Sequence, residues 1–132
     1  MNMQTTPQQK SRVFLNPDGY IELIFHGVVY HDTLRQLIDG STALAAVHGP
    51  INALIDGRFG AVDRKAKTFR VMMSMGRISG MKNVIILTSN DSQAIHAIHG
   101  PSIVTSILSS ALGFKPAYID DEAEARAMAA SK

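Results

Sequence analysis

Short apolar runs of strand length alternate with helical patterns along the chain. The runs at residues 12–15 and 20–25 predict two strands, and the Asn-Pro-Asp-Gly sequence at 16–19 between them is typical of a tight turn. A turn of this length joins the two strands as an antiparallel hairpin. Gly27 predicts a bulge or bend before the apolar residues 28–30.

The next segment has the periodicity of an amphipathic helix. Its inward positions are Leu34, Leu37, Ile38, Ser41, Leu44, Ala45 and His48. Asp32 or Thr33 is expected to cap this helix, and Gly49-Pro50 ends it. A short apolar strand at 51–55 and a loop at 56–62 are expected to follow.

A second helix is predicted over residues 62–78, and the continuous apolar run at 83–88 predicts a central strand buried on both faces. A third helical region is expected to begin at 91–92 and to end at Gly113. Within it, Gly100-Pro101 predicts a kink or a division into two helices.

The last two elements are a strand at 116–119 and an alanine-rich helix. Asp121 and Glu124 have the spacing of a capping pair at the start of this helix. The order ββαβαβαβα predicts one α/β domain at 11–132, after a flexible tail at 1–10. We expect a mixed sheet that is mostly parallel, with one antiparallel hairpin strand and about four helices packed against it.

Composition excludes several classes of site. The 132 residues include no cysteine, which rules out disulfides, thiolate metal sites and cysteine nucleophiles. The polar first ten residues do not resemble a signal peptide, so we expect a cytoplasmic protein. No apolar run approaches the roughly 20 residues of a membrane span, so no membrane insertion is expected.

Positive charge is concentrated in one segment. The net charge of the chain is +2, yet residues 58–82 contain seven Lys or Arg and one Asp, a local charge of +6 that leaves −4 for the rest. A local basic region of this kind indicates an acidic partner or an anionic ligand. Because these residues lie all round the second predicted helix, nucleic acid is not the expected partner.

Three segments carry a resemblance to a known family. They are residues 52–56, which lead through the predicted loop into the long second helix, the strand at 83–88, and the ending at 117–123. Together with the early hairpin they resemble the STAS superfamily, and within it the SpoIIAA-like branch, over residues 12–128. The resemblance implies a small mixed sheet covered by helices, used for binding and regulation rather than for catalysis.

The resemblance also implies a comparison at the start of the second helix. Anti-sigma-factor antagonists of this superfamily have an Asp-Ser-Ser-Gly-like motif there, in which one serine is phosphorylated. Asp63 falls at the aspartate of that motif, but Arg64 and Lys65 stand where the serines would be. A switch by serine phosphorylation is therefore not expected at this site.

The predicted loop and the helix start after it form our candidate binding site. A helix that begins after the carboxyl end of a central strand offers exposed amides to an anion. Its candidate residues are Asp56, Gly57, Arg58, Gly60, Asp63, Arg64 and Lys65. The alternative is that the glycines only permit a turn and that water solvates the charges. The match of residues 57–60 to the GxxG of nucleic-acid-binding loops is discounted, because that loop joins two helices.

The second helix has two apolar faces. Ala66, Phe69, Met73 and Gly76 are expected to pack on the sheet. The other face consists of Val71, Met75 and Ile78, which either form a docking or homodimer surface or are buried by a neighbouring helix.

Signatures of catalysis and of metal binding are weak. His96 and His99 would share a helical face, but no obvious third ligand lies near them, although His26, His31 or Asp91 could converge on them in space. We expect no metal and no cofactor. The sequence contains no GxSxG, Walker A, GxGxxG or HExxH motif.

The function that these patterns favour is a non-enzymatic binding or regulatory domain. It would recognise a protein partner or a small anionic ligand. One alternative is a carrier of lipids or other apolar small molecules, because the STAS fold resembles lipid-carrier domains. A third, less favoured, is a small hydrolase or isomerase that uses Asp56 with a histidine.

Overall fold

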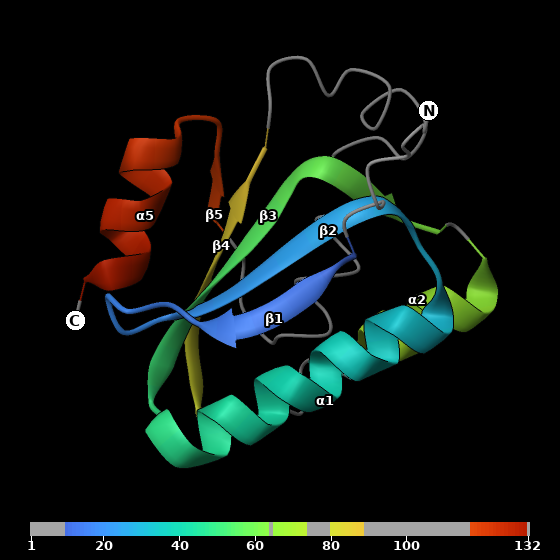
Figure 1. Ribbon diagram of the computed structural model, residues 1–132, viewed down its shortest axis with the longest axis horizontal. Helices are drawn as coiled ribbons and strands as arrows, with labels where there is room; N and C mark the ends of the chain where they lie inside the picture. The colour runs from blue at the N-terminus through green and yellow to red at the C-terminus, as the bar shows by residue number, and fades with distance from the viewer. Residues whose placement is uncertain (1–9, 64, 74–79, 89–116, 132) are drawn as a thin grey trace, which may run out of the picture.

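Five strands form a mixed sheet in the order β1-β2-β3-β4-β5 (Figure 1). The computed structural model describes residues 10–63, 65–73, 80–88 and 117–131. The strands are β1 (Arg12–Leu15), β2 (Ile21–Val29), β3 (Ile51–Val62), β4 (Met81–Leu87) and β5 (Ala117–Ile119). The described helices are α1 (His31–His48), α2 (Ala66–Met73) and α5 (Glu122–Ala130). The third predicted helical region lies outside the described residues.

The predicted hairpin is confirmed. β1 and β2 pair antiparallel, whereas β2, β3, β4 and β5 are parallel to one another. In the turn, the side-chain oxygen of Asn16 accepts a hydrogen bond from the Asp18 amide at 2.8 Å, and Gly19 has a φ of 91°. These are the conformations that the Asn-Pro-Asp-Gly sequence favours.

The central pair, β2 and β3, is longer than the sequence predicts. β3 continues through Val62, so the loop expected at 56–62 is wrong: these residues are strand. They continue because β2 also extends to Val29, and the two strands stay paired as far as Val29–Val62. The register shifts between Ile24 and His26, which confirms an irregularity near Gly27.

The two faces of the sheet carry separate apolar clusters. Alternate residues of β2 and β3, including Ile21, Leu23 and Ile55, pack with α1 and α2 in the larger cluster. The opposite face, which includes Tyr20 and Leu54, packs with α5 in the smaller one. Figure 1 shows α1 and α2 along one side of the sheet and α5 on the other. The β2–α1–β3 and β3–α2–β4 connections have the same handedness, and this places α1 and α2 on the same face of the sheet.

The predicted cap of α1 is wrong, whereas that of α5 has the predicted position but not the predicted hydrogen bond. α1 begins at His31, after Tyr30, which makes no side-chain cap hydrogen bond, and Asp32 lies inside the first turn. The Asp32 carboxylate accepts a hydrogen bond from the adjacent Thr33 amide instead. Asp121 does precede α5, but its side chain makes no capping bond.

The start and the inward face of α2 also differ from the prediction. The helix begins at Ala66, four residues later than expected, because β3 runs on through Val62. Thr68, Val71 and Met72 face inward, whereas Met73, which we expected on the sheet, is 45% exposed. Thr68 is accommodated inside because its hydroxyl donates a hydrogen bond to Asp63 at 3.1 Å.

Among the described residues, no helix is both long and apolar enough to cross a membrane.

Candidate functional site

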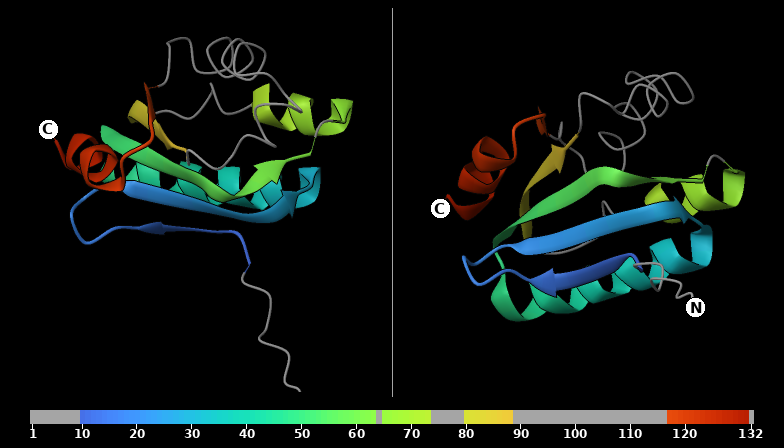
Figure 2. Two further views of the ribbon diagram at one scale, coloured as in Figure 1. Left: turned by 90° about the horizontal axis from the view of Figure 1, so that it is seen from above. Right: turned by 45° about the horizontal axis from the view of Figure 1, so that its top comes forward.

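An open pocket of about 550 Å³ lies where β2 and β3 end. Val29 and Val62, the last residues of these parallel strands, are register partners, so α1 and the segment leading to α2 start side by side. Figure 2 shows the beginning of α1 next to α2 at this edge. The pocket is lined by Tyr30, His31, Asp32, Asp63, Lys65, Ala66, Lys67 and Arg70. This edge, at the carboxyl ends of parallel strands, is where open α/β sheets hold ligands.

Backbone dipoles add positive potential to this pocket. The amides of the first turn of a helix have no acceptor within the helix, and its N-terminal end carries a partial positive charge. The start of α1 lines the pocket, and Asp32 in its first turn accepts a hydrogen bond from the Thr33 amide and offsets part of this potential. The first turn of α2 contains no acidic residue to offset its dipole.

Charged side chains strengthen that potential. Lys65, Lys67 and Arg70 line the pocket, are exposed, and form no ion pair with any other described residue. Asp32 and Asp63 contribute two negative charges. Histidine aside, the side chains of the pocket therefore carry a net charge of +1.

Asp63 links the end of the sheet to the start of α2 through two hydrogen bonds. Its backbone amide donates to the carbonyl of Val29 at 2.8 Å, which extends the pairing of β2 with β3 by one residue. Its carboxylate accepts the hydrogen bond from Thr68 described above. Asp63 therefore holds the start of α2 at a fixed place beside the end of β2.

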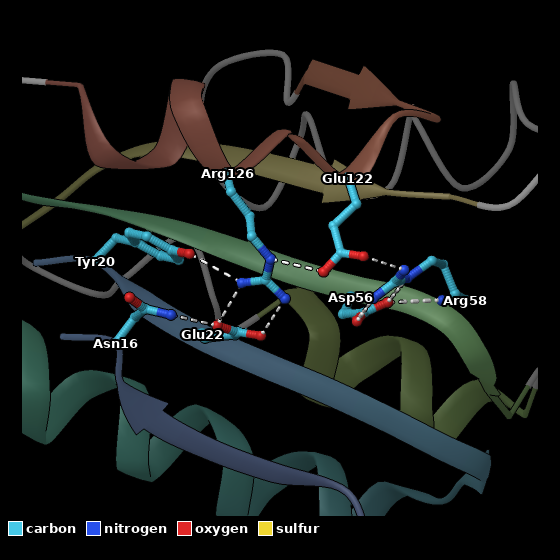
Figure 3. Close-up of polar contacts among 7 residues, drawn as sticks. All are labelled: Asn16, Tyr20, Glu22, Asp56, Arg58, Glu122 and Arg126. Atoms are coloured by element: carbon cyan, nitrogen blue, oxygen red, sulfur yellow. Dashed lines mark hydrogen bonds and ion pairs between the residues drawn. The ribbon is translucent and has the colours of Figure 1, made fainter. Parts of the chain in front are cut away.

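A second polar cluster lies on the α5 face of the sheet (Figure 3). The guanidinium of Arg58 is bidentate to the Asp56 carboxylate, at 2.9 Å and 2.8 Å, and donates to Glu122 at 2.9 Å. Glu122 also accepts a bond from Arg126 at 2.8 Å, and Arg126 donates to both carboxylate oxygens of Glu22. We call these five residues the charge chain.

Two members of the charge chain are buried carboxylates. Asp56 is 1% and Glu22 is 2% exposed, and each faces an arginine that reaches solvent at its other side. Hydrogen bonding to Asp56 raises the pKa of Arg58, and hydrogen bonding to Glu22 raises that of Arg126. Hydrogen bonds from Arg126 and Arg58 lower the pKa of Glu122. The two arginines and Glu122 are therefore held in their charged forms.

The structure divides the site residues predicted from the sequence. Asp63 and Lys65 line the pocket, whereas Asp56 and Arg58 belong to the charge chain on the α5 face. The ion pairs of Arg58 argue against its predicted role as a free cation for an anion. Arg64 lies outside the described residues.

Gly57 and Gly60 do not form the expected ligand-binding turn. Both lie within β3. A Cβ on Gly60 would lie 2.5 Å from the carbonyl oxygen of Gly27, so Gly60 is required by the close approach of two strands. Gly57 has no such contact, since a Cβ there would meet only the Leu87 carbonyl oxygen at 3.5 Å.

Six lining residues were not among the predicted site residues, and one of them is Ala66, the first residue of α2. The other five are Tyr30, His31, Asp32, Lys67 and Arg70. Lys67 and Arg70 belong to the basic segment that the charge pattern does identify. The other three come from the start of α1, and only the pairing of β2 with β3 brings them to the same edge.

Val71 was predicted to lie either on an exposed docking or dimer surface or under a neighbouring element. Its side chain is 4% exposed and belongs to the larger core cluster, so the second alternative holds for this residue. Met75 and Ile78 lie outside the described residues. No group of three or more His, Asp or Glu side chains that could hold a metal ion is present in the described part of the chain.

Comparisons with known proteins bear on the fold. No protein-family model matches the chain, and no curated protein matches it. The crystal structure of an uncharacterized DUF3478-family protein from Shewanella loihica PV-4, with a SpoIIAA-like fold, is similar, with a TM-score of 0.62. The match covers 97% of this chain and 99% of that chain at 16% sequence identity. The chain therefore has a SpoIIAA-like fold, as its sequence pattern predicts.

Proposed function

We propose that this STAS-like domain is a binding module that recognises an anionic group, on a small ligand or a protein partner, in the pocket at the ends of β2 and β3. The observation that carries the proposal is the set of three cations, Lys65, Lys67 and Arg70, in one pocket with the starts of α1 and α2. Exposed cations without an ion-pair partner are available to a ligand, whereas those of the charge chain are already neutralised.

The mode of binding follows from these groups. An anion in the pocket would accept hydrogen bonds from first-turn amides and from lysine and arginine side chains, as anions at helix starts do. Tyr30, which is 52% exposed at the rim, adds an aromatic surface and a hydroxyl. Because two carboxylates share the pocket, we expect moderate affinity, with a marked dependence on ionic strength.

The serine switch of related domains has no counterpart in this proposal. Where that motif has serines, this chain has Arg64 and Lys65, so the charge at this position is fixed and positive. Binding would then be controlled by the concentration of the ligand or partner, not by phosphorylation here.

The other two functions considered from the sequence gain less support. The pocket is open and five of its eight lining side chains are charged, so it is not the enclosed apolar cavity that a lipid carrier needs. Both carboxylate oxygens of Asp56 accept bonds from Arg58, and no described histidine forms a hydrogen bond or ion pair with Asp56. Asp56 is thus engaged in a structural pair rather than poised beside a histidine.

The test is a titration with inorganic phosphate followed by backbone amide NMR. We expect the largest shifts at residues 30–33 and 65–68. The double variant Lys67→Glu/Arg70→Glu should weaken binding about tenfold or more, because two attractive contacts become repulsive.

The double variant Lys10→Glu/Lys82→Glu provides the matched control. Lys10 and Lys82 are exposed cations outside the pocket, so this variant makes the same change in net charge without altering the lining. Equal weakening by the control and by Lys67→Glu/Arg70→Glu, or shifts spread over the whole surface, would contradict the proposal.

A further inference from the structure

We propose that α5 is an electrostatic latch, a helix that detaches from the sheet as one unit while the rest of the fold stays intact. The proposal rests on how α5 is attached, which differs from the attachment of α1. The proposal does not depend on the anion pocket, which is lined by residues at the starts of α1 and α2 and by none of α5.

The apolar contacts of α5 are few and small. Its buried residues are Ala125 and Ala129, and its length is 9 residues. By contrast α1 has 18 residues and buries Leu34, Leu37 and Ile38, among others. Alanine buries a single methyl group, so α5 itself contributes less apolar surface to its contact with the sheet than α1 does.

Polar contacts supply the remaining attachment, and they are placed at both ends of the helix. At its start, Glu122 and Arg126 join the charge chain and reach Arg58 and Glu22 on the sheet (Figure 3). At its end, the side-chain amide of Asn52 donates to the carbonyls of Ala129 and Ser131 at 3.0 Å and 2.8 Å.

Arg126 makes most of the hydrogen bonds at the start of α5. It donates to both oxygens of Glu22, to Glu122, and at 2.9 Å to the hydroxyl of Tyr20. Asn16, in the β1–β2 turn, also donates to Glu22 at 2.9 Å, so this carboxylate keeps one partner when the latch opens.

Opening and melting of α5 are coupled. An isolated helix shorter than about 12 residues is marginal in water, so α5 is helical only while it is docked. Its release would expose the apolar residues beneath it, including Tyr20, Leu54 and Leu87. A segment with few apolar contacts and many polar ones opens at a lower free energy than the core.

Native-state hydrogen exchange on the full chain tests the proposal. We expect the amides of 123–131 to exchange faster than those of β2 and β3, and to exchange several-fold faster at 1 M than at 0.05 M salt, because the exposed parts of the charge chain are screened. Arg126→Gln should accelerate exchange in α5 by at least about tenfold, because it removes the bonds to Glu22, Glu122 and Tyr20. Arg126→Lys should restore part of the protection, since the charge is retained.

Two further variants separate a latch from general destabilisation. Glu122→Gln removes links to both arginines without leaving a buried charge, because Glu122 is 46% exposed, and should also accelerate exchange in α5. Arg35→Gln, an exposed arginine of α1, should change neither region. Exchange of α5 at the same free energy as the strands, or no acceleration of α5 by Arg126→Gln, would overturn the proposal.

Discussion

Gly60 on β3 and Gly27 on β2 are register partners whose backbones leave no room for a Cβ on Gly60. A Cβ built on Gly60 would lie 2.5 Å from the Gly27 carbonyl oxygen and 2.7 Å from its nitrogen. Gly27 has a φ of 65°, a conformation that other residues rarely adopt. This contact lies two residues before the paired strands end at Val29 and Val62.

The first prediction concerns that contact. Gly60→Ala should lower the free energy of unfolding by about 2 kcal/mol, because the methyl group meets backbone atoms that cannot rotate away. Gly57→Ala is the matched control on the same strand, where the nearest atom is at an ordinary 3.5 Å. Urea denaturation of both variants measures the difference. Equal stability would mean that the strands can separate at Gly60 without cost.

The course of β3 shows where the sequence was misleading. Glycines at 57 and 60 beside an aspartate are typical of a turn, and local pattern alone gives no reason to continue a strand through them. β3 continues through these glycines because Gly60 pairs with Gly27 of β2, a strand that is distant in the sequence. The order of the described strands along the chain, the hairpin and the first helix were predictable because their signals are local periodicities.

The charge chain was not predictable for a related reason. It joins Glu22, Asp56, Arg58, Glu122 and Arg126, which come from three elements. Each residue alone looks like a solvated surface charge or, for Arg58, like a ligand-binding cation. Only the packing of α5 on β2 and β3 reveals that their charges are mutually satisfied.

The second prediction concerns the orientation of α2. Val71→Ala should cost about 1–2 kcal/mol, because Val71 is 4% exposed and its methyl groups leave a cavity when removed. Met73→Ala, two residues on and 45% exposed, should change stability by less than about 0.5 kcal/mol. Thermal or urea unfolding measures both. A larger loss for Met73→Ala than for Val71→Ala would instead support the prediction from the sequence that Met73 packs on the sheet.

The third prediction uses the asymmetry of the Asp56–Arg58 pair. Arg58→Met leaves the buried Asp56 carboxylate without its counter-ion and should destabilise the fold by about 2–3 kcal/mol. Asp56→Asn should cost less, about 1 kcal/mol, because Arg58 keeps Glu122 and reaches water. Chemical denaturation at pH 7 measures both. A larger loss for Asp56→Asn would indicate that Arg58, not Asp56, bears the cost of desolvation.

The fourth prediction is a pH dependence that arises from Glu122. Bonds from Arg126 and Arg58 hold the pKa of this carboxyl below its usual value of 4.5. A carboxyl whose pKa is lower in the folded state stabilises the protein above its unfolded pKa, and this contribution is lost as the pH falls through the folded value. The Tm of wild type should therefore exceed that of Glu122→Gln at pH 7, and the difference should narrow below pH 4.5.

A control on the same helix isolates that effect. Glu124 is exposed and forms no ion pair with another described residue, so Glu124→Gln should shift the Tm little at either pH. If the two variants have the same pH profile, the effect belongs to net charge and not to the bonds of Glu122.

The fifth prediction concerns the acidic residue inside the anion pocket. Asp63→Asn removes one negative charge from the lining, while the amide oxygen can still accept the hydrogen bond from Thr68. Under the proposed function, affinity for inorganic phosphate should rise about two- to fivefold, the effect of one charge at a solvent-exposed site. Asp39→Asn on the exposed face of α1, outside the pocket, makes the same change in net charge and should leave the affinity unchanged. NMR titration at low salt measures both variants. Tighter binding in both, or in neither, would show that phosphate does not occupy the pocket beside Asp63.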